Sequence, residues 1–168
     1  MSAPHEKPSI RPAQLGDVAT ILRMVRALAD YERLLHACVA TEEDFREALF
    51  PATPDTPPVA AALLAFSGEK AVGFALYYTT FSTFLGRPGI YLDDLFVEPE
   101  YRGQGFGVAL LKQLARIAVE RRYGRVEWCV LTWNEPSIHF YQRLGAVAME
   151  EWRTFRLTGE ALQRLGTD

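Results

Sequence analysis

The chain has 168 residues, of which 49% are hydrophobic and 23% charged, and its formal net charge is −3. This size and composition predict a single globular domain over 1–168, and the lack of a basic excess argues against nucleic acid as a partner. No apolar run is long enough for a membrane span, and the N-terminus lacks the apolar segment of a signal peptide, so we expect a cytoplasmic protein that binds no membrane.

The hydrophobic periodicity predicts alternating helices and strands. Thr41 and Asp44 are placed as in a capping box at the start of one helix. The turn SGEK at 67–70 joins two strands into an antiparallel hairpin. In chain order, we predict a strand at 9–13, helices at 16–34 and 41–50, strands at 59–66, 71–81 and 90–97, a helix at 105–122, a strand at 125–133, a short helix at 134–146 and a strand at 150–157.

This order indicates an α/β fold with a mixed sheet and helices packed on it. The strand at 90–97, the helix that follows and the strand at 125–133 form a βαβ unit, so these two strands should be parallel. Cys38 and Cys129 are expected to be reduced thiols, with Cys129 buried in its strand. The scattered cysteines and histidines predict no metal site.

Three glycines alternate in YRGQGFG, 101–107, between a predicted strand and a helix. They could simply allow a turn, because glycine adopts positive φ freely. The dinucleotide motif would need glycine where Val108 stands, and the Walker motif is absent. What remains is Arg102-x-x-Gly105-x-Gly107 at a helix start, where free amides and the helix dipole favour a diphosphate.

The segment LFVEPEYRGQGFGVALL resembles the acetyl-CoA-binding motif of the GCN5-related N-acetyltransferases (GNAT). YLDDLFV and WNEPSIHFYQRLGA extend the resemblance toward the spermidine/spermine (diamine) acetyltransferase branch. The resemblance implies that the glycine loop binds the pyrophosphate of acetyl-CoA and that the strand before it pairs with the pantetheine arm. The residues implied in binding the cofactor are Leu95, Phe96, Val97, Arg102, Gly103, Gln104, Gly105, Phe106, Gly107, Val108, Asn134, Pro136, Ser137 and Tyr141.

Asp93 and Asp94 are adjacent on a strand, so we expect their side chains on opposite faces of the sheet. They could bond loop amides, but two acids among apolar residues are costly unless satisfied. The resemblance implies that Asp93 relays a proton from the substrate amine through water, and that Asp94 is structural. The branch usually has glutamate in place of Asp93.

Asn134, Ser137 and Tyr141 share one face of the predicted short helix. A tyrosine in such a helix is more often a core or interface residue. The resemblance implies instead that Tyr141 is the general acid that protonates the thiolate of CoA. The acetyl group would then pass directly to the amine in a ternary complex, with no covalent enzyme intermediate.

The resemblance places substrate contacts at Tyr31, Glu32, Asp93, Glu127, Trp128 and Glu151. Ser82 and Phe84 stand where the polyamine enzymes carry an acidic residue and a tryptophan. A shorter diamine, an aminoalkyl compound or a lysine analogue such as thialysine therefore fits at least as well as a long polyamine. The alternatives are a non-catalytic acyl-CoA-binding regulatory module and an acetyltransferase of protein N-termini or lysines. The branch also implies a homodimer, with the segment 152–157 near the interface.

Overall fold

The structure is a computed structural model that describes residues 7–167. The chain divides into two compact units, one ending at Cys129 and the other beginning at Val130. The first unit contains β1 (Ser9–Pro12), η1 (Leu15–Asp17), α1 (Val18–Tyr31), η2 (Leu35–Ala37), α2 (Glu42–Leu49), β2 (Ala61–Ser67), β3 (Lys70–Ser82), β4 (Arg87–Val97), η3 (Pro99–Tyr101), α3 (Phe106–Glu120) and β5 (Val126–Glu127).

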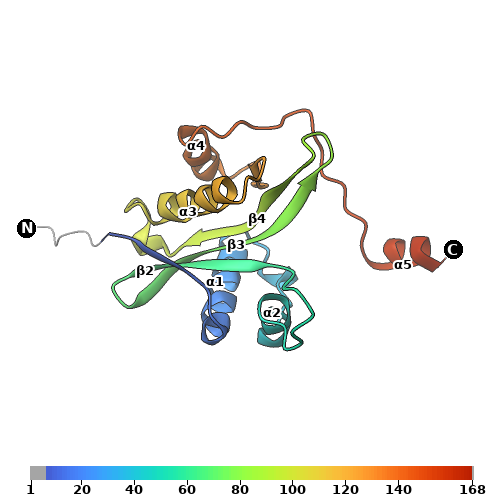
Figure 1. Ribbon diagram of the computed structural model, residues 1–168, viewed down its shortest axis with the longest axis horizontal. Helices are drawn as coiled ribbons and strands as arrows, with labels where there is room; N and C mark the ends of the chain where they lie inside the picture. Colours follow the sequence, from blue (N-terminus) through green and yellow to red (C-terminus); the bar gives the residue numbers. More distant parts are fainter. Residues whose placement is uncertain (1–6, 168) are drawn as a thin grey trace, which may run out of the picture. The chain divides into compact units, whose positions relative to one another are not determined.

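The five strands of this unit form one sheet in the order β1-β2-β3-β4-β5. Neighbouring strands are antiparallel except β4 and β5, which are parallel. The predicted hairpin and the predicted βαβ unit are therefore both confirmed. Figure 1 shows α3 on one face of the sheet and α1 with α2 on the other.

Each face of the sheet buries its own hydrophobic cluster. On one face, Leu110 and Leu114 of α3 pack with Ile90 and Leu92 of β4. On the other face, Ile21 and Met24 of α1 pack with Phe74 and Phe96. Because side chains alternate along a regular strand, Ile90 and Leu92 on one face place Tyr91 on the other.

Local signals explain where two of the helices begin. At the start of α2, Asp44 N donates to Thr41 Oγ1 and Thr41 N donates to Asp44 Oδ2, at 3.2 and 2.7 Å. This confirms the predicted capping box. At the start of α3, Gly105 is the N-cap residue and has φ +90°.

Strand lengths differ from those predicted. β3 extends to Ser82 and β4 begins at Arg87, so the connection between the strands predicted at 71–81 and 90–97 is shorter than expected. The strand predicted at 125–133 is much shorter, because only Val126 and Glu127 pair with β4. Strand propensity does not reveal how far a partner strand stays within pairing distance.

The second unit contains α4 (Glu135–Arg143) and α5 (Gly159–Thr167). The strand predicted at 150–157 was wrong, since these residues have no regular structure. Trp152 is 70% exposed and Phe155 is 92% exposed, so these two aromatic side chains form no buried face of a strand. α5 was not predicted.

Candidate functional site

The glycine loop leads into α3 with an open N-terminus. Gly103 has φ +75° and Gly105 has φ +90°, both in the left-handed region that favours glycine. A Cβ placed on either residue would meet no atom within 4 Å, so the space above the loop is open. No side chain caps the helix, and its first turn holds no acidic residue. The first-turn amides thus face a space that suits an anion.

Arg102 links this loop to α1. Its Nε donates to the carbonyl oxygen of Val97 at 3.0 Å. Its guanidinium carbon lies 4.8 Å from the ring centroid of Tyr31 and 5.7 Å from that of Phe96. Tyr31, which the sequence assigned to the substrate, thus lies beside the strand and loop assigned to the cofactor.

Glu98 anchors the start of the loop and was missed by the sequence analysis. Its carboxylate accepts from Arg23 of α1 and pairs with Lys70 of β3, each at 2.8 Å, and the residue is only 8% exposed. Burial alone would raise the pKa of Glu98, but the hydrogen bonds from Lys70 and Arg23 bring it below its ordinary value. The two ion pairs tie the loop to both neighbouring elements.

One edge of β4 is open next to the loop. The other edge of β4 pairs with β3 along the length of the strand. On the open edge, β5 pairs with β4 only at Ile90 and Tyr91. Among the described residues, the backbone from Leu92 to Val97 has no strand partner on the β5 side. An extended ligand with amide groups can pair with such an edge.

The two adjacent aspartates lie at a bulge in β4. Leu76 is opposite Asp94 and Tyr77 is opposite Leu92, which leaves Asp93 without an opposite residue in β3. The bulge interrupts the regular alternation on which the expectation of opposite faces rested. Asp93 is exposed and Asp94 is partly buried.

Asp94 lies in an acidic environment. Burial, with the charges of Asp93 and Glu32 added to it, raises the pKa of Asp94 from 3.8 to about 7. Burial also raises the pKa of Glu32, which follows the last residue of α1. A carboxyl group with a pKa near neutrality can accept and release a proton under ordinary conditions.

Two tyrosines beside the acids were not singled out from the sequence. Tyr78 and Tyr91 are opposite each other in β3 and β4, and their rings stack with centroids 5.2 Å apart and planes at 25°. The hydroxyl of Tyr91 donates to Sγ of Cys129 at 3.0 Å. Cys129 is exposed, so the expectation of a buried strand cysteine was wrong; β5 has already ended at Glu127.

Glu127 and Trp128 have other partners. Nε of Arg125 donates to Glu127 Oε2 at 2.6 Å, which balances the charge of that carboxylate. Trp128 packs against the hydrophobic cluster beneath α3, on the face opposite to Phe96.

In the second unit, Tyr141 is partly buried on α4 with its ring centroid 5.2 Å from that of Phe140. Asn134 Oδ1 accepts from the backbone N–H of Ser137 at 3.4 Å, so Asn134 caps α4. Pro136 is the second residue of this helix, and Glu151 is exposed beyond it.

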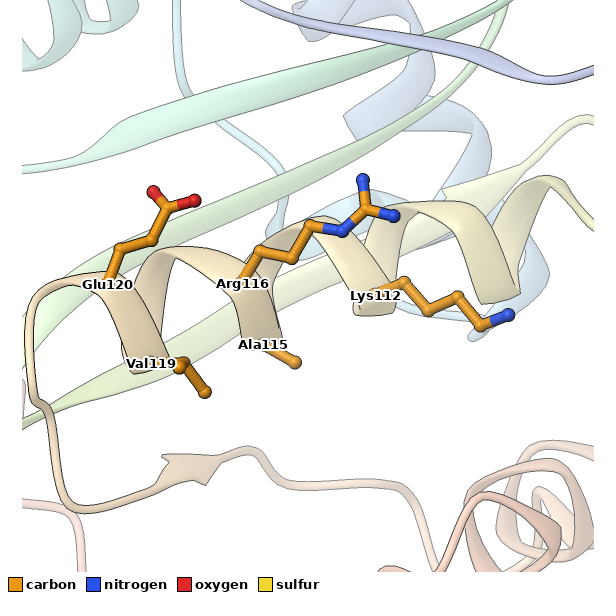
Figure 2. A pocket seen from close by; sticks show the side chains of 5 residues that line it. All are labelled: Lys112, Ala115, Arg116, Val119 and Glu120. Carbon is orange, nitrogen blue, oxygen red and sulfur yellow. The ribbon is translucent and has the colours of Figure 1, made fainter.

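A hollow of about 350 Å³ lies along the exposed side of α3 (Figure 2). No predicted site residue lines it; the lining residues are Lys112, Ala115, Arg116, Val119 and Glu120. Within residues 7–167, no three histidine, cysteine or acidic side chains gather as metal ligands would. Over the same range, no helix has both the length and the apolar character of a membrane span.

Comparisons with known proteins give a consistent family. Residues 24–146 match the family model described as acetyltransferase (GNAT) family. Thialysine N-epsilon-acetyltransferase of Bos taurus is 40% identical over 163 residues, covering 93% of this chain and 95% of the relative. L-ornithine N5-acetyltransferase NATA1 of Arabidopsis thaliana is 32% identical, covering 93% of this chain and 86% of the relative.

Solved structures share the fold. An integron cassette protein from the mobile metagenome of V. cholerae has a TM-score of 0.78 at 25% identity, covering 96% of this chain and 98% of its own. An aminoglycoside acetyltransferase from an uncultured soil metagenomic sample has a TM-score of 0.75 at 18% identity, and the match covers 91% of this chain and 97% of the other. The second likeness concerns the fold alone.

Proposed function

Because this chain belongs to the acetyltransferase (GNAT) family and is an N-acetyltransferase, we propose that it transfers an acetyl group from acetyl-CoA to a primary amine of a small molecule. The observation that carries this proposal is the group of three acids, Asp94, Asp93 and Glu32, next to the open edge of β4. The names of the relatives support it, since thialysine and ornithine are both small amino compounds.

The glycine loop and β4 suit acetyl-CoA. The left-handed Gly103 and Gly105 and the uncapped start of α3 offer main-chain amides to a diphosphate. The open edge at Leu95 to Val97 offers backbone groups to the amides of the pantetheine arm. When bound, acetyl-CoA supplies the acetyl group as a reactive thioester.

The acids prepare the amine. An alkylamine with a pKa near 10.4 is mostly protonated at neutral pH, and deprotonating it at pH 7.5 costs about 4 kcal/mol. Asp94 is partly buried and has a pKa of about 7, which supports it as the proton acceptor. The exposed Asp93, to which the resemblance assigned this step, is then a second carboxylate that attracts a cationic substrate.

Tyr141 is our candidate for the acid that protonates the departing thiolate. A phenol can donate a proton, and Tyr141 lies on α4, whose start is fixed by the Asn134 cap. A simple thiol has a pKa of about 8.5, so proton donation assists its departure without being indispensable.

The β3–β4 connection favours a short acceptor over a long polyamine. Ser82 is only 6% exposed, and its Oγ accepts hydrogen bonds from Leu85 N and Arg125 Nη1. Ser82 therefore stabilises the β3–β4 hairpin. Its side chain has no negative charge that could bind the distant ammonium group of a long polyamine. Phe84 is 92% exposed.

We also propose that the enzyme is a cytoplasmic homodimer. The exposed aromatic residues Trp152 and Phe155 support an interface in the second unit, and the free thiols of Cys38 and Cys129 suit a reducing compartment.

The proposed function is tested by following the release of the CoA thiol from acetyl-CoA with diamines, polyamines, diamino acids and peptides in turn. We expect turnover with small diamines or diamino acids. Acetyl-CoA binding without turnover on any amine would favour the regulatory module, and turnover on peptides alone would favour a protein acetyltransferase.

A further inference from the structure

The stacked tyrosines Tyr78 and Tyr91 lie on the same face of the sheet as Asp94. Ile90, Leu92 and Tyr77 belong to the cluster beneath α3. Tyr91 lies between Ile90 and Leu92, and Tyr78 follows Tyr77, so both tyrosines point to the opposite face. On that opposite face, Leu76 and Phe96 pack with α1, and Asp94 stands opposite Leu76.

The tyrosine pair is held in place and remains accessible. The rings stack on each other, and the Tyr91 hydroxyl is held by its hydrogen bond to Cys129. Both residues are only partly buried. Two neutral aromatic rings fixed in this way offer a π surface to a cation.

Asp93 supplies a negative charge beside these rings. Burial and the charge of Asp93 raise the pKa of Tyr78. The hydrogen bond to Cys129 and burial raise the pKa of Tyr91, and Asp93 contributes to this shift as well. Both phenols therefore stay neutral, while the carboxylate of Asp93 makes the space beside the two rings attractive to an ammonium group.

We propose that Tyr78, Tyr91 and Asp93 form a second subsite, which binds a cationic nitrogen of the acceptor other than the one acetylated. This inference rests on the proposed function, in which the reacting amine lies at Asp94. The acceptor is thus a linear molecule with two ammonium groups, one at each end of a short chain.

The spacing along β4 sets the length of that chain. Asp94 follows Tyr91 by three residues, which is a distance of about 10 Å along a regular strand. Because the bulge at Asp93 shortens the strand locally, the distance between the two subsites is about 7–10 Å. An extended chain of roughly 1.5 Å bonds advances about 1.25 Å per bond, so six or seven bonds between the nitrogens span about 7.5–9 Å. Diamines with five or six carbons and diamino acids of the same reach fit the two subsites.

The test compares kcat/KM for 1,5-diaminopentane and 5-aminopentan-1-ol, which differ only in the second ammonium group. We expect the wild type to prefer the diamine, after correction for its two equivalent ends. Tyr78→Leu or Tyr91→Leu should reduce this preference roughly tenfold, while Tyr78→Phe, which keeps the ring, should retain it. Phe81→Leu, which removes an exposed aromatic residue from the same strand, is the control and should leave the preference unchanged.

Two further arms keep the outcome clear. Asp93→Asn changes an exposed side chain and should also reduce the preference, which covers the case in which the leucine variants do not fold. The pair 1,3-diaminopropane and 3-aminopropan-1-ol should show little preference, because the second nitrogen cannot reach the tyrosines. An unchanged preference in Tyr78→Leu, Tyr91→Leu and Asp93→Asn would overturn the subsite while leaving the acetyltransferase function intact.

If no amine is acetylated, the proposed function fails, and calorimetry then tests the subsite alone. Weaker binding of 1,5-diaminopentane to Tyr78→Leu than to Tyr78→Phe would support the subsite. Equal binding to the two variants would overturn it.

Discussion

Replacing Asp94 by asparagine should make the protein more stable at alkaline pH while lowering its activity. Folding raises the pKa of Asp94 from 3.8 to about 7, so between these values the folded chain binds a proton that the unfolded chain has lost. The free energy of unfolding therefore falls as the pH rises through this window. A difference of about three pH units corresponds to about 4 kcal/mol, and the partial exposure of the side chain reduces this to about 2–4 kcal/mol.

Urea unfolding of wild type and Asp94→Asn at pH 4.5 and pH 8 measures this effect. The variant should gain about 1.5–3 kcal/mol relative to wild type between the two pH values, because it no longer buries a charge and part of the window lies below pH 4.5. Asp55→Asn, at an exposed position in the loop after α2, controls for the loss of one negative charge. A wild-type-to-variant difference that stays constant between the two pH values would refute the assignment of a buried, proton-binding carboxyl group to Asp94.

Three other changes test separate parts of the site. Gly105→Val should weaken acetyl-CoA binding measured by calorimetry at least tenfold, because valine disfavours φ +90° and its methyl groups enter the open space above the loop; a folded variant with unchanged affinity would place the diphosphate elsewhere. Tyr141→Phe should lower kcat by about 10²-fold with little change in acetyl-CoA affinity, and a value within twofold of wild type under chemistry-limited conditions would rule out its role as the acid. Glu98→Gln should lower the free energy of unfolding by about 1.5–3 kcal/mol at pH 7, and this loss should shrink as the pH falls through the lowered pKa of Glu98; equal stability at pH 7 would mean that the two ion pairs add nothing.

Local signals predicted much of the first unit. The capping box of α2, the hairpin of β2 and β3 and the glycine start of α3 depend on residues close together in the sequence. Each is readable because the responsible side chains and the structure they produce lie within a few positions of one another.

The parts that were missed depend on contacts between distant residues. The bulge at Asp93 follows from how β4 pairs with β3, and at this bulge Asp93 is exposed while Asp94 is partly buried. Glu98 pairs with Arg23 and Lys70, and Tyr91 meets Cys129 across the sheet, none of which a local pattern reveals. For the same reason the sequence analysis gave the proton relay to Asp93 and a structural role to Asp94, and could not tell that Asp94 is the one with the raised pKa.

The open edge of β4 also bears on how the protein avoids aggregation. An unpaired strand edge invites pairing with an edge from another molecule, and natural proteins counter this with charges and bulges. Here a bulge and two adjacent aspartates lie within the stretch of β4 that β5 leaves unpaired. The features that we assign to proton transfer and amine binding thus also act as gatekeepers against intermolecular sheet formation when no ligand covers the strand.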